Sequence, residues 1–163
     1  MGGKFGFIPL QVPNALLTLQ SLINYNMLDL ILLIDDDAPT NMLNSIIIKK
    51  LNCCKQVVAQ QRADLALEYL KELGANQNRA PDLILLDINM PGMNGWEFLE
   101  EYEKLESSLK ASAIVVMLTT SLNPEDEKRS KVVSHLSSFE NKPLTKEKMQ
   151  NILQRYFPET TFD

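Results

Sequence analysis

The chain has 163 residues, about the size of a single domain and long enough to bury a hydrophobic core. Its apolar share of 45% is that of an ordinary soluble globular protein, and its net charge of −5 leaves no basic surface for nonspecific binding of nucleic-acid backbones. The two cysteines, Cys53 and Cys54, are neighbours and make no disulfide framework, so a reducing cytoplasm is the expected compartment.

The first 26 residues stand apart from the regular pattern that begins at Met27. They contain a lysine, two prolines and an apolar stretch, but polar residues interrupt that stretch and no small-residue cleavage site follows it. Because a membrane span needs about 20 apolar residues, we expect neither a signal peptide nor a membrane helix here. We interpret residues 1–26 as an N-terminal extension, and the sequence leaves open whether it is native.

From Met27 onward, short apolar runs alternate with segments of helical periodicity. Nearly unbroken apolar runs are typical of central parallel strands that are covered on both faces. Such runs occupy residues 28–34, 57–59, 83–86 and 113–118. A weaker fifth strand is predicted near residues 137–141.

An amphipathic helix is predicted after each strand. The apolar positions that define the first three are 42, 43, 46, 47 and 51, then 63, 66, 67, 70 and 73, then 98, 99, 102 and 105. Gly74 is expected to end the second helix. Asp37, Asn123 and Thr145 are predicted N-caps of the first, fourth and fifth helices.

Five β-α units with right-handed crossovers predict an α/β fold, a doubly wound five-stranded parallel sheet. We expect one domain over residues 27–157, followed by a short C-terminal tail at 158–163. In such sheets, ligands bind beyond the carboxyl ends of the strands. Residues that directly follow the predicted strands are therefore the candidate site.

Three acids, a hydroxyl and an ammonium group follow those strands. Asp35 and Asp36 come after the first strand, Asp87 after the third, Thr119 after the fourth and Lys142 after the fifth. Carboxylates at close range repel one another unless some are protonated or a cation lies among them. Oxygen ligands without histidine or cysteine suit Mg²⁺, which commonly completes its coordination shell with a phosphate oxygen.

The same residue set suits phosphoryl transfer. With a metal ion on one phosphoryl oxygen, Lys142 neutralises a second and the Thr119 hydroxyl hydrogen-bonds a third, while a carboxylate attacks phosphorus in line. Asp87 is the natural nucleophile, because a buried strand fixes its position and the turn-forming stretch 89–92 bends the backbone around it.

Four motifs in this order resemble the receiver domain of two-component response regulators: LLIDDD, ILLDINMPGMNGWEFL, VVMLTTS and NKPLT. The similarity extends over about residues 27–157 and implies a flavodoxin-like (βα)5 fold. It also implies that Asp87 is the phosphoacceptor, that Asp36 binds Mg²⁺ directly and Asp35 through water, and that the backbone carbonyl of Asn89 is a further ligand.

The resemblance further implies that Thr119 and Lys142 contact the phosphoryl group. In the family, an aromatic residue three positions before the lysine moves together with the hydroxyl residue. That aromatic is Phe139 here, so it can act as a packing switch without a hydroxyl of its own. The family signals through the face made by the fourth helix, fifth strand and fifth helix. Its members tune self-dephosphorylation through positions that are Asn89 and Ser121 here.

The function implied is that of a stand-alone signalling switch rather than a turnover enzyme. It accepts a phosphoryl group on Asp87 from a sensor histidine kinase, or exchanges it with a histidine phosphotransfer protein, and acts through contacts with a downstream protein. Self-dephosphorylation is expected to be slow. No nucleic-acid or membrane partner is expected.

Two alternatives remain open at the level of sequence. A haloacid-dehalogenase-like phosphatase would use Asp35 as nucleophile and Asp37 as acid/base, although Pro39 departs from its motif and Asp87 is left without a role. A receiver fold used only for phosphorylation-independent docking is the other alternative.

Other conspicuous residues have structural interpretations. Trp96 and Phe98 are expected to pack in or near the core. His135 is expected to be a solvated residue without a catalytic role. The fourth helix has no apolar residue between 125 and 131, and we expect it to be mobile.

Overall fold

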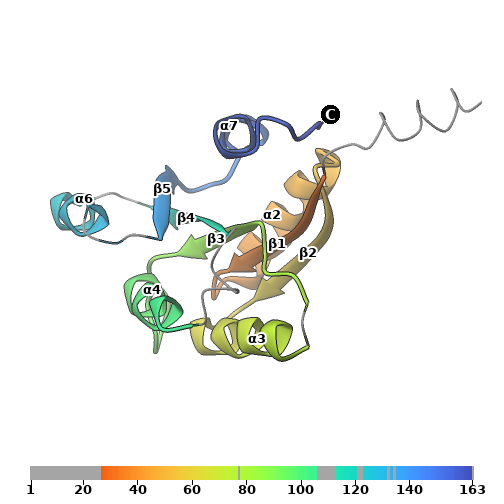
Figure 1. The fold of residues 1–163 in the computed structure, drawn as a ribbon. Helices are drawn as coiled ribbons and strands as arrows, with labels where there is room; N and C mark the ends of the chain where they lie inside the picture. The colour runs from red at the N-terminus through yellow and green to blue at the C-terminus, as the bar shows by residue number, and fades with distance from the viewer. Residues whose placement is uncertain are drawn as a thin grey trace, which may run out of the picture.

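The computed structural model describes residues 27–76, 78–105, 113–120, 123–131, 133 and 135–162, so the N-terminal extension lies outside the described residues. Within this part of the chain, five parallel strands form one sheet in the order β2-β1-β3-β4-β5 (Figure 1). The strands are β1 (Leu28–Ile34), β2 (Cys54–Gln60), β3 (Leu83–Asp87), β4 (Ile114–Thr119) and β5 (Leu136–Asn141). The predicted fold class is confirmed, and the fifth strand is confirmed one residue longer than predicted.

Helices cover both faces of the sheet (Figure 1). Helices α2 (Ala38–Lys50) and α7 (Lys146–Tyr156) lie together on one face. Helices α3 (Ala63–Ala75) and α4 (Gly95–Glu103) lie together on the other, and the short helix α6 (Pro124–Ser130) is at the β5 side of the molecule. The sheet is therefore the middle of three layers.

Alternating strand residues divide the core into two halves. On β1, Leu32 and Ile34 pack into the cluster under α3 and α4, while Ile31 and Leu33 pack into the cluster under α2 and α7. All four side chains are at most 1% exposed. This double burial explains why the strand has no polar alternation. It also fixes the register that brings the strand ends together.

The predicted buried face of the first helix is only partly confirmed, since Leu51 is buried and Ile47 packs against the core. Met42 and Leu43 are 66% and 61% exposed, whereas Asn41, Asn44 and Ile48 face the protein interior. Apolar side chains occur on both sides of this helix, so spacing alone did not decide which side is buried. Asn41 is inside, where its amide nitrogen donates to the carbonyl of Asp35 at 2.7 Å, while its Oδ1 has no hydrogen-bond partner among the described residues.

Two further expectations need correction. The strand predicted at 57–59 is not central: β2 runs from 54 to 60 at the edge of the sheet, and none of its residues is fully buried. Strand order depends on long-range pairing, which a local apolar run does not encode. Gly74 does not end its helix, since α3 continues to Ala75 and is capped by Asn76, whose N–H donates to the carbonyl of Glu72.

The predicted N-caps are confirmed. Asp37 accepts a hydrogen bond from the Thr40 N–H, and Thr145 accepts one from the Lys148 N–H. Asn123 accepts from the N–H groups of the second and third residues of α6, directly before Pro124. These side chains satisfy backbone donors that a helix start leaves unpaired.

The segment after α7 packs back onto the protein. Thr160 is buried, and Phe157 and Phe162 contact the core cluster beneath α2 and α7. The predicted tail at 158–163 is thus part of the packed structure as far as it is described. None of the described helices is long and apolar enough to cross a membrane.

Candidate functional site

The acidic residues that follow β1 and β3 lie side by side. The pairing of Ile34 with Leu86 places the ends of these two strands next to each other. One carboxylate oxygen from each of Asp35, Asp36 and Asp87 lies within 4.8 Å of the others. Asp35 and Asp87 are only 2% and 4% exposed, whereas Asp36 is exposed. The predicted cluster therefore forms a partly buried acidic pocket, open to solvent on the Asp36 side.

Lys142 reaches into this pocket from the end of β5. Its Nζ lies 2.7 Å from Asp35 Oδ2 and 2.9 Å from Asp87 Oδ1, and its side chain is 16% exposed. The Lys142–Pro143 peptide bond is cis, and the Lys142 N–H donates to the carbonyl of Thr119 at 2.7 Å. The ammonium group thus bridges two carboxylates that come from different strands.

Burial and neighbouring charges shift the pKa values of Asp87 and Lys142. Burial raises the pKa of Asp87, Lys142 lowers it and the charge of Asp35 raises it, with a net pKa above the ordinary value. Burial lowers the pKa of Lys142, but hydrogen bonds and charges from Asp35 and Asp87 outweigh that effect and raise it overall. Lys142 therefore stays charged, and it compensates only part of the negative charge of three carboxylates.

This donor set fits a hard divalent cation. Three carboxylates with converging oxygens, and no histidine or cysteine among them, are the ligands that Mg²⁺ prefers. Asp35, Asp36 and Asp87 would hold the ion, which when bound would offset the excess negative charge and polarise a phosphoryl oxygen. The carbonyl of Asn89, expected as a further ligand, belongs to the loop that directly follows β3.

Thr119 and Phe139 occupy the strands beside the pocket. Thr119 is the last residue of β4, is 1% exposed, and is one position beyond Leu118, the pairing partner of Asp87. Phe139 lies on β5, and its ring is 5.9 Å from the ring of Trp96. The structure therefore gathers Asp35, Asp36, Asp87 and Lys142 directly, with Thr119 at the neighbouring strand end and Phe139 further along β5.

Sequence reasoning missed the residues that hold the pocket in shape. Asn41 donates to the Asp35 carbonyl, and the Asp37 N–H donates to Asp35 Oδ1 at 3.0 Å. Gly95 contacts the acceptor from the other side, since a Cβ on it would lie 2.5 Å from the Asp87 carbonyl oxygen. A polar residue at an inward helix position and a glycine at a helix start were the available signals.

The remaining conspicuous residues lie outside the pocket. Trp96 and Phe98 are buried, as predicted, at 5% and 0% exposure. His135 is partly exposed and its Nε2 lies 2.5 Å from Glu103 Oε2, rather than being merely solvated. Both cysteines are free thiols.

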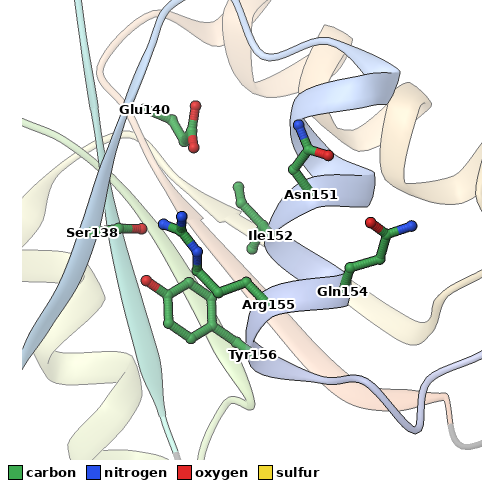
Figure 2. A pocket seen from close by; sticks show the side chains of 7 residues that line it. All are labelled: Ser138, Glu140, Asn151, Ile152, Gln154, Arg155 and Tyr156. Carbon is green, nitrogen blue, oxygen red and sulfur yellow. The ribbon is translucent and has the colours of Figure 1, made fainter.

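A separate cavity of about 460 Å³ lies between β5 and α7 (Figure 2). Its lining is mostly polar and consists of Ser138, Glu140, Asn151, Ile152, Gln154, Arg155 and Tyr156. The Tyr156 hydroxyl donates to the carbonyl of Ser137 at 2.9 Å and so joins α7 to the strand edge. None of the residues of the acidic pocket lines this cavity.

The sequence of residues 31–154 matches the response regulator receiver domain family. It is 29% identical to the probable methanogenesis regulatory protein FilR2 of Methanothrix harundinacea over 77% of this chain and 79% of that protein. It is 31% identical to the two-component response regulator ARR14 of Arabidopsis thaliana, over 76% of this chain but only 30% of that protein. The same unit therefore also occurs within longer proteins.

Solved structures agree with the sequence match. A two-component response regulator from Cytophaga hutchinsonii is 32% identical and superposes with a TM-score of 0.74, covering 81% of this chain and 98% of that one. The chain belongs to the response regulator receiver domain family.

Proposed function

We propose that this receiver domain is a phosphorylation-dependent switch that accepts a phosphoryl group on Asp87. The observation that carries the proposal is the Lys142 ammonium group between Asp35 and Asp87, with Asp36 completing a cation-binding set. Nucleophile, counter-charge and metal donors come from the ends of three different strands. Such convergence is what in-line phosphoryl transfer requires of a protein, namely positioning and charge stabilisation.

The donor proposed is the phosphohistidine of a sensor histidine kinase or of a histidine phosphotransfer protein. An Asp87 oxygen forms a bond to phosphorus, the phosphorus–nitrogen bond breaks, and the histidine nitrogen takes up a proton. Lys142 stabilises the charge that collects on the phosphoryl oxygens. The Thr119 hydroxyl is assigned a hydrogen bond to the same group, and Mg²⁺ is assigned to the three carboxylates and the Asn89 carbonyl.

Exposed apolar side chains on α2 support a protein partner. Met42, Leu43 and Ile46 project from α2, the helix that begins three residues after Asp35, and they are 66%, 61% and 38% exposed. Large exposed apolar side chains that cluster on one helix are typical of an interaction surface. We assign this surface to the protein that delivers the phosphoryl group, because α2 begins three residues after Asp35 of the pocket.

For output we assign the face formed by α6, β5 and α7 to an unidentified protein target. The polar cavity of Figure 2 lies within this face, and Phe139 lies on β5, the strand that Lys142 directly follows. Phe139 is proposed as a packing switch. We propose no nucleic-acid or membrane partner.

The functional unit proposed is residues 27–157, and it acts as a switch with slow self-dephosphorylation rather than as a turnover enzyme. The elements from Leu28 to Tyr156 enclose both core clusters and the pocket. Two free cysteines support a cytoplasmic location.

The pocket disfavours the phosphatase alternative. Asp37, which would be its acid/base, caps α2 through Thr40 and is exposed, and it is not one of the carboxylates that converge. That mechanism also leaves Asp87, which pairs with Lys142, without a role. The experiment below distinguishes the proposed switch from a module that only docks, independently of phosphorylation.

The test is incubation of the full chain with Mg²⁺ and acetyl phosphate, followed by intact-mass measurement. We expect one phosphoryl adduct, lost in Asp87→Asn and strongly reduced by chelation of Mg²⁺. Asp64→Asn is the matched control, because it removes an exposed carboxylate of α3 outside the pocket and should leave the adduct unchanged.

Each alternative predicts a different result. Sustained release of phosphate from monoesters, unaffected by Asp87→Asn, would favour the phosphatase. A chain that folds and binds Mg²⁺ but never gains an adduct would favour the docking module.

A further inference from the structure

One indole ring joins α4, β5 and α6. Trp96, in the first turn of α4, donates from Nε1 to Asp126 Oδ1 of α6 at 2.9 Å. Its ring lies 5.9 Å from the ring of Phe139 on β5, and the guanidinium of Arg129 on α6 lies 5.1 Å from its centroid. Since Trp96 is only 5% exposed, these contacts fix it from three sides.

The helix α6 has little apolar surface of its own. Its sequence, PEDEKRS, offers no large apolar side chain that could be buried. Besides the two indole contacts, Arg129 pairs with Glu100 of α4 at 2.6 Å, and both of these side chains are largely exposed. An exposed ion pair contributes little to stability. The buried indole therefore anchors the helix through Asp126 and Arg129.

Two of these elements, α4 and β5, are also linked to the phosphoacceptor. Gly95, the residue before it, packs directly on the carbonyl of Asp87, and its N–H donates to the carbonyl of Ile88 at 2.9 Å. Phe139 lies three residues before Lys142, whose ammonium group is paired with Asp87. A phosphoryl group on Asp87 would offer its oxygens to Lys142 in place of a carboxylate partner. Such an exchange would displace the end of β5 relative to the start of α4.

We propose that Trp96 is a positioning residue that transmits the state of the Asp87 pocket to α6. Its indole holds α6 against α4 while Asp87 carries no phosphoryl group, and the displacement of Phe139 breaks the hydrogen bond to Asp126 and releases the helix. The inference rests on the proposed function. It adds to that function a specific connection between the pocket and one element of the output face.

Trp96 is the only tryptophan of the chain, so its emission reports this contact directly. The experiment follows tryptophan emission and intact mass in parallel, on the full chain with Mg²⁺ and acetyl phosphate. We expect the emission to change with the same time course as the adduct. Amide hydrogen exchange over residues 125–130 should accelerate at least about fivefold in the phosphorylated protein, because the helix loses its anchor.

Two variants separate this coupling from mere packing. Asp126→Ala removes the hydrogen-bond acceptor from α6, so emission and α6 exchange before phosphorylation should already resemble those of the phosphorylated wild type. Since a contact made only in the unphosphorylated state disfavours the other state, adduct formation should also rise about fivefold. Glu125→Ala removes the same charge from the same turn without touching the indole and should behave as wild type.

The outcomes distinguish this inference from the function on which it rests. An adduct that forms on Asp87 without a change in emission or in α6 exchange would overturn the role of Trp96 and leave the switch intact. Equal behaviour of Asp126→Ala and Glu125→Ala would overturn it as well. A chain that forms no adduct would refute the proposed function, and the coupling with it.

Discussion

At Gly95 the backbone of α4 comes into direct contact with the backbone of the acceptor. A side chain there has no room, since its Cβ would lie 2.5 Å from the Asp87 carbonyl oxygen and 3.0 Å from the Ile88 Cα. Gly92, in the same loop, is different: it has a φ of +80°, and a Cβ added to it would meet no atom within 4 Å. One glycine is required by space and the other by backbone conformation.

Gly95→Ala is therefore expected to cost about 2 kcal/mol of unfolding free energy through overpacking, and to slow phosphorylation by displacing Asp87. Gly92→Ala should cost about 1 kcal/mol through its left-handed backbone and leave the rate of adduct formation near wild type. Chemical denaturation and acetyl phosphate kinetics measure the two effects. Equal phosphorylation rates in the two variants would show that the Gly95 contact does not position the acceptor.

Tyr102 carries a buried hydroxyl group without a hydrogen-bond partner among the described residues. Tyr102→Phe should raise stability at neutral pH by about 1 kcal/mol, because it removes an unpaired polar group. Burial raises the pKa of Tyr102 to about 12. The ordinary phenol ionises near pH 10, so wild type should lose about 2–3 kcal/mol between pH 10 and 12 that the variant retains. Chemical denaturation at neutral pH and at pH 10 to 12 measures both effects. An equal loss of stability in the two proteins between pH 10 and 12 would contradict the prediction.

Among the elements, the starts of β1 and β3 are joined by one buried carboxylate. Asp82 Oδ2 accepts hydrogen bonds from the backbone N–H groups of Asp29 at 2.6 Å and Leu30 at 3.2 Å. Its Oδ1 lies 3.4 Å from Arg79 Nη2, and its own N–H donates to the carbonyl of Leu30. This cluster lies at the amino ends of the strands, opposite the acidic pocket, and has no part in the proposed chemistry.

Asp82→Ala should cost about 3 kcal/mol, because it leaves two N–H groups of β1 without their acceptor. The adduct on Asp87 should still form in the fraction that remains folded. Asp29→Ala, which removes a partly exposed partner of the exposed side chains Lys55 and Arg79, should cost less than about 1 kcal/mol. Urea denaturation of the two variants measures these losses of unfolding free energy. Similar losses would show that the buried hydrogen bonds of Asp82 stabilise the protein no more than the ion pairs of Asp29 do.

Helices and strands were predictable from sequence, because hydrophobic periodicity and capping residues are features of each segment's own sequence. The buried face of α2 was not, since Met42 and Leu43 are apolar yet exposed, and Asn41 is polar yet buried by a bond to Asp35. The edge position of β2 also depends on strand order rather than on its own residues. The anchor of α6 joins Trp96 to Asp126 across 30 positions, a separation that no local pattern encodes.

At the scale of the whole molecule, the parallel sheet brings distant carboxylates to one edge. The rule that ligands bind beyond the carboxyl ends of strands was enough to select Asp35, Asp36, Asp87 and Lys142 from the sequence. It did not supply the pairing of Lys142 with both Asp35 and Asp87, which depends on how the loop after β5 crosses the sheet edge. The residue types at the strand ends were readable from the sequence, whereas the contacts between them depend on the folded sheet.

Because one ammonium group faces three carboxylates, a divalent cation should stabilise the folded protein. At a Mg²⁺ concentration about ten times its dissociation constant, linkage gives about 1.4 kcal/mol and a rise in Tm of roughly 3–6 °C. Asp36→Asn should lose most of this rise, while Asp64→Asn keeps it. Thermal unfolding in MgCl₂ and in NaCl of equal ionic strength measures the difference. An identical response to both salts would argue against a specific cation site.

The phosphoacceptor assignment is tested most directly by locating the acyl phosphate on the chain. Borohydride reduction converts a phosphorylated aspartate to homoserine, which peptide mass spectrometry identifies by position. After treatment with Mg²⁺ and acetyl phosphate, homoserine is predicted at position 87 alone. Homoserine at position 35 or 36, with an unmodified Asp87, would contradict the proposed pocket chemistry.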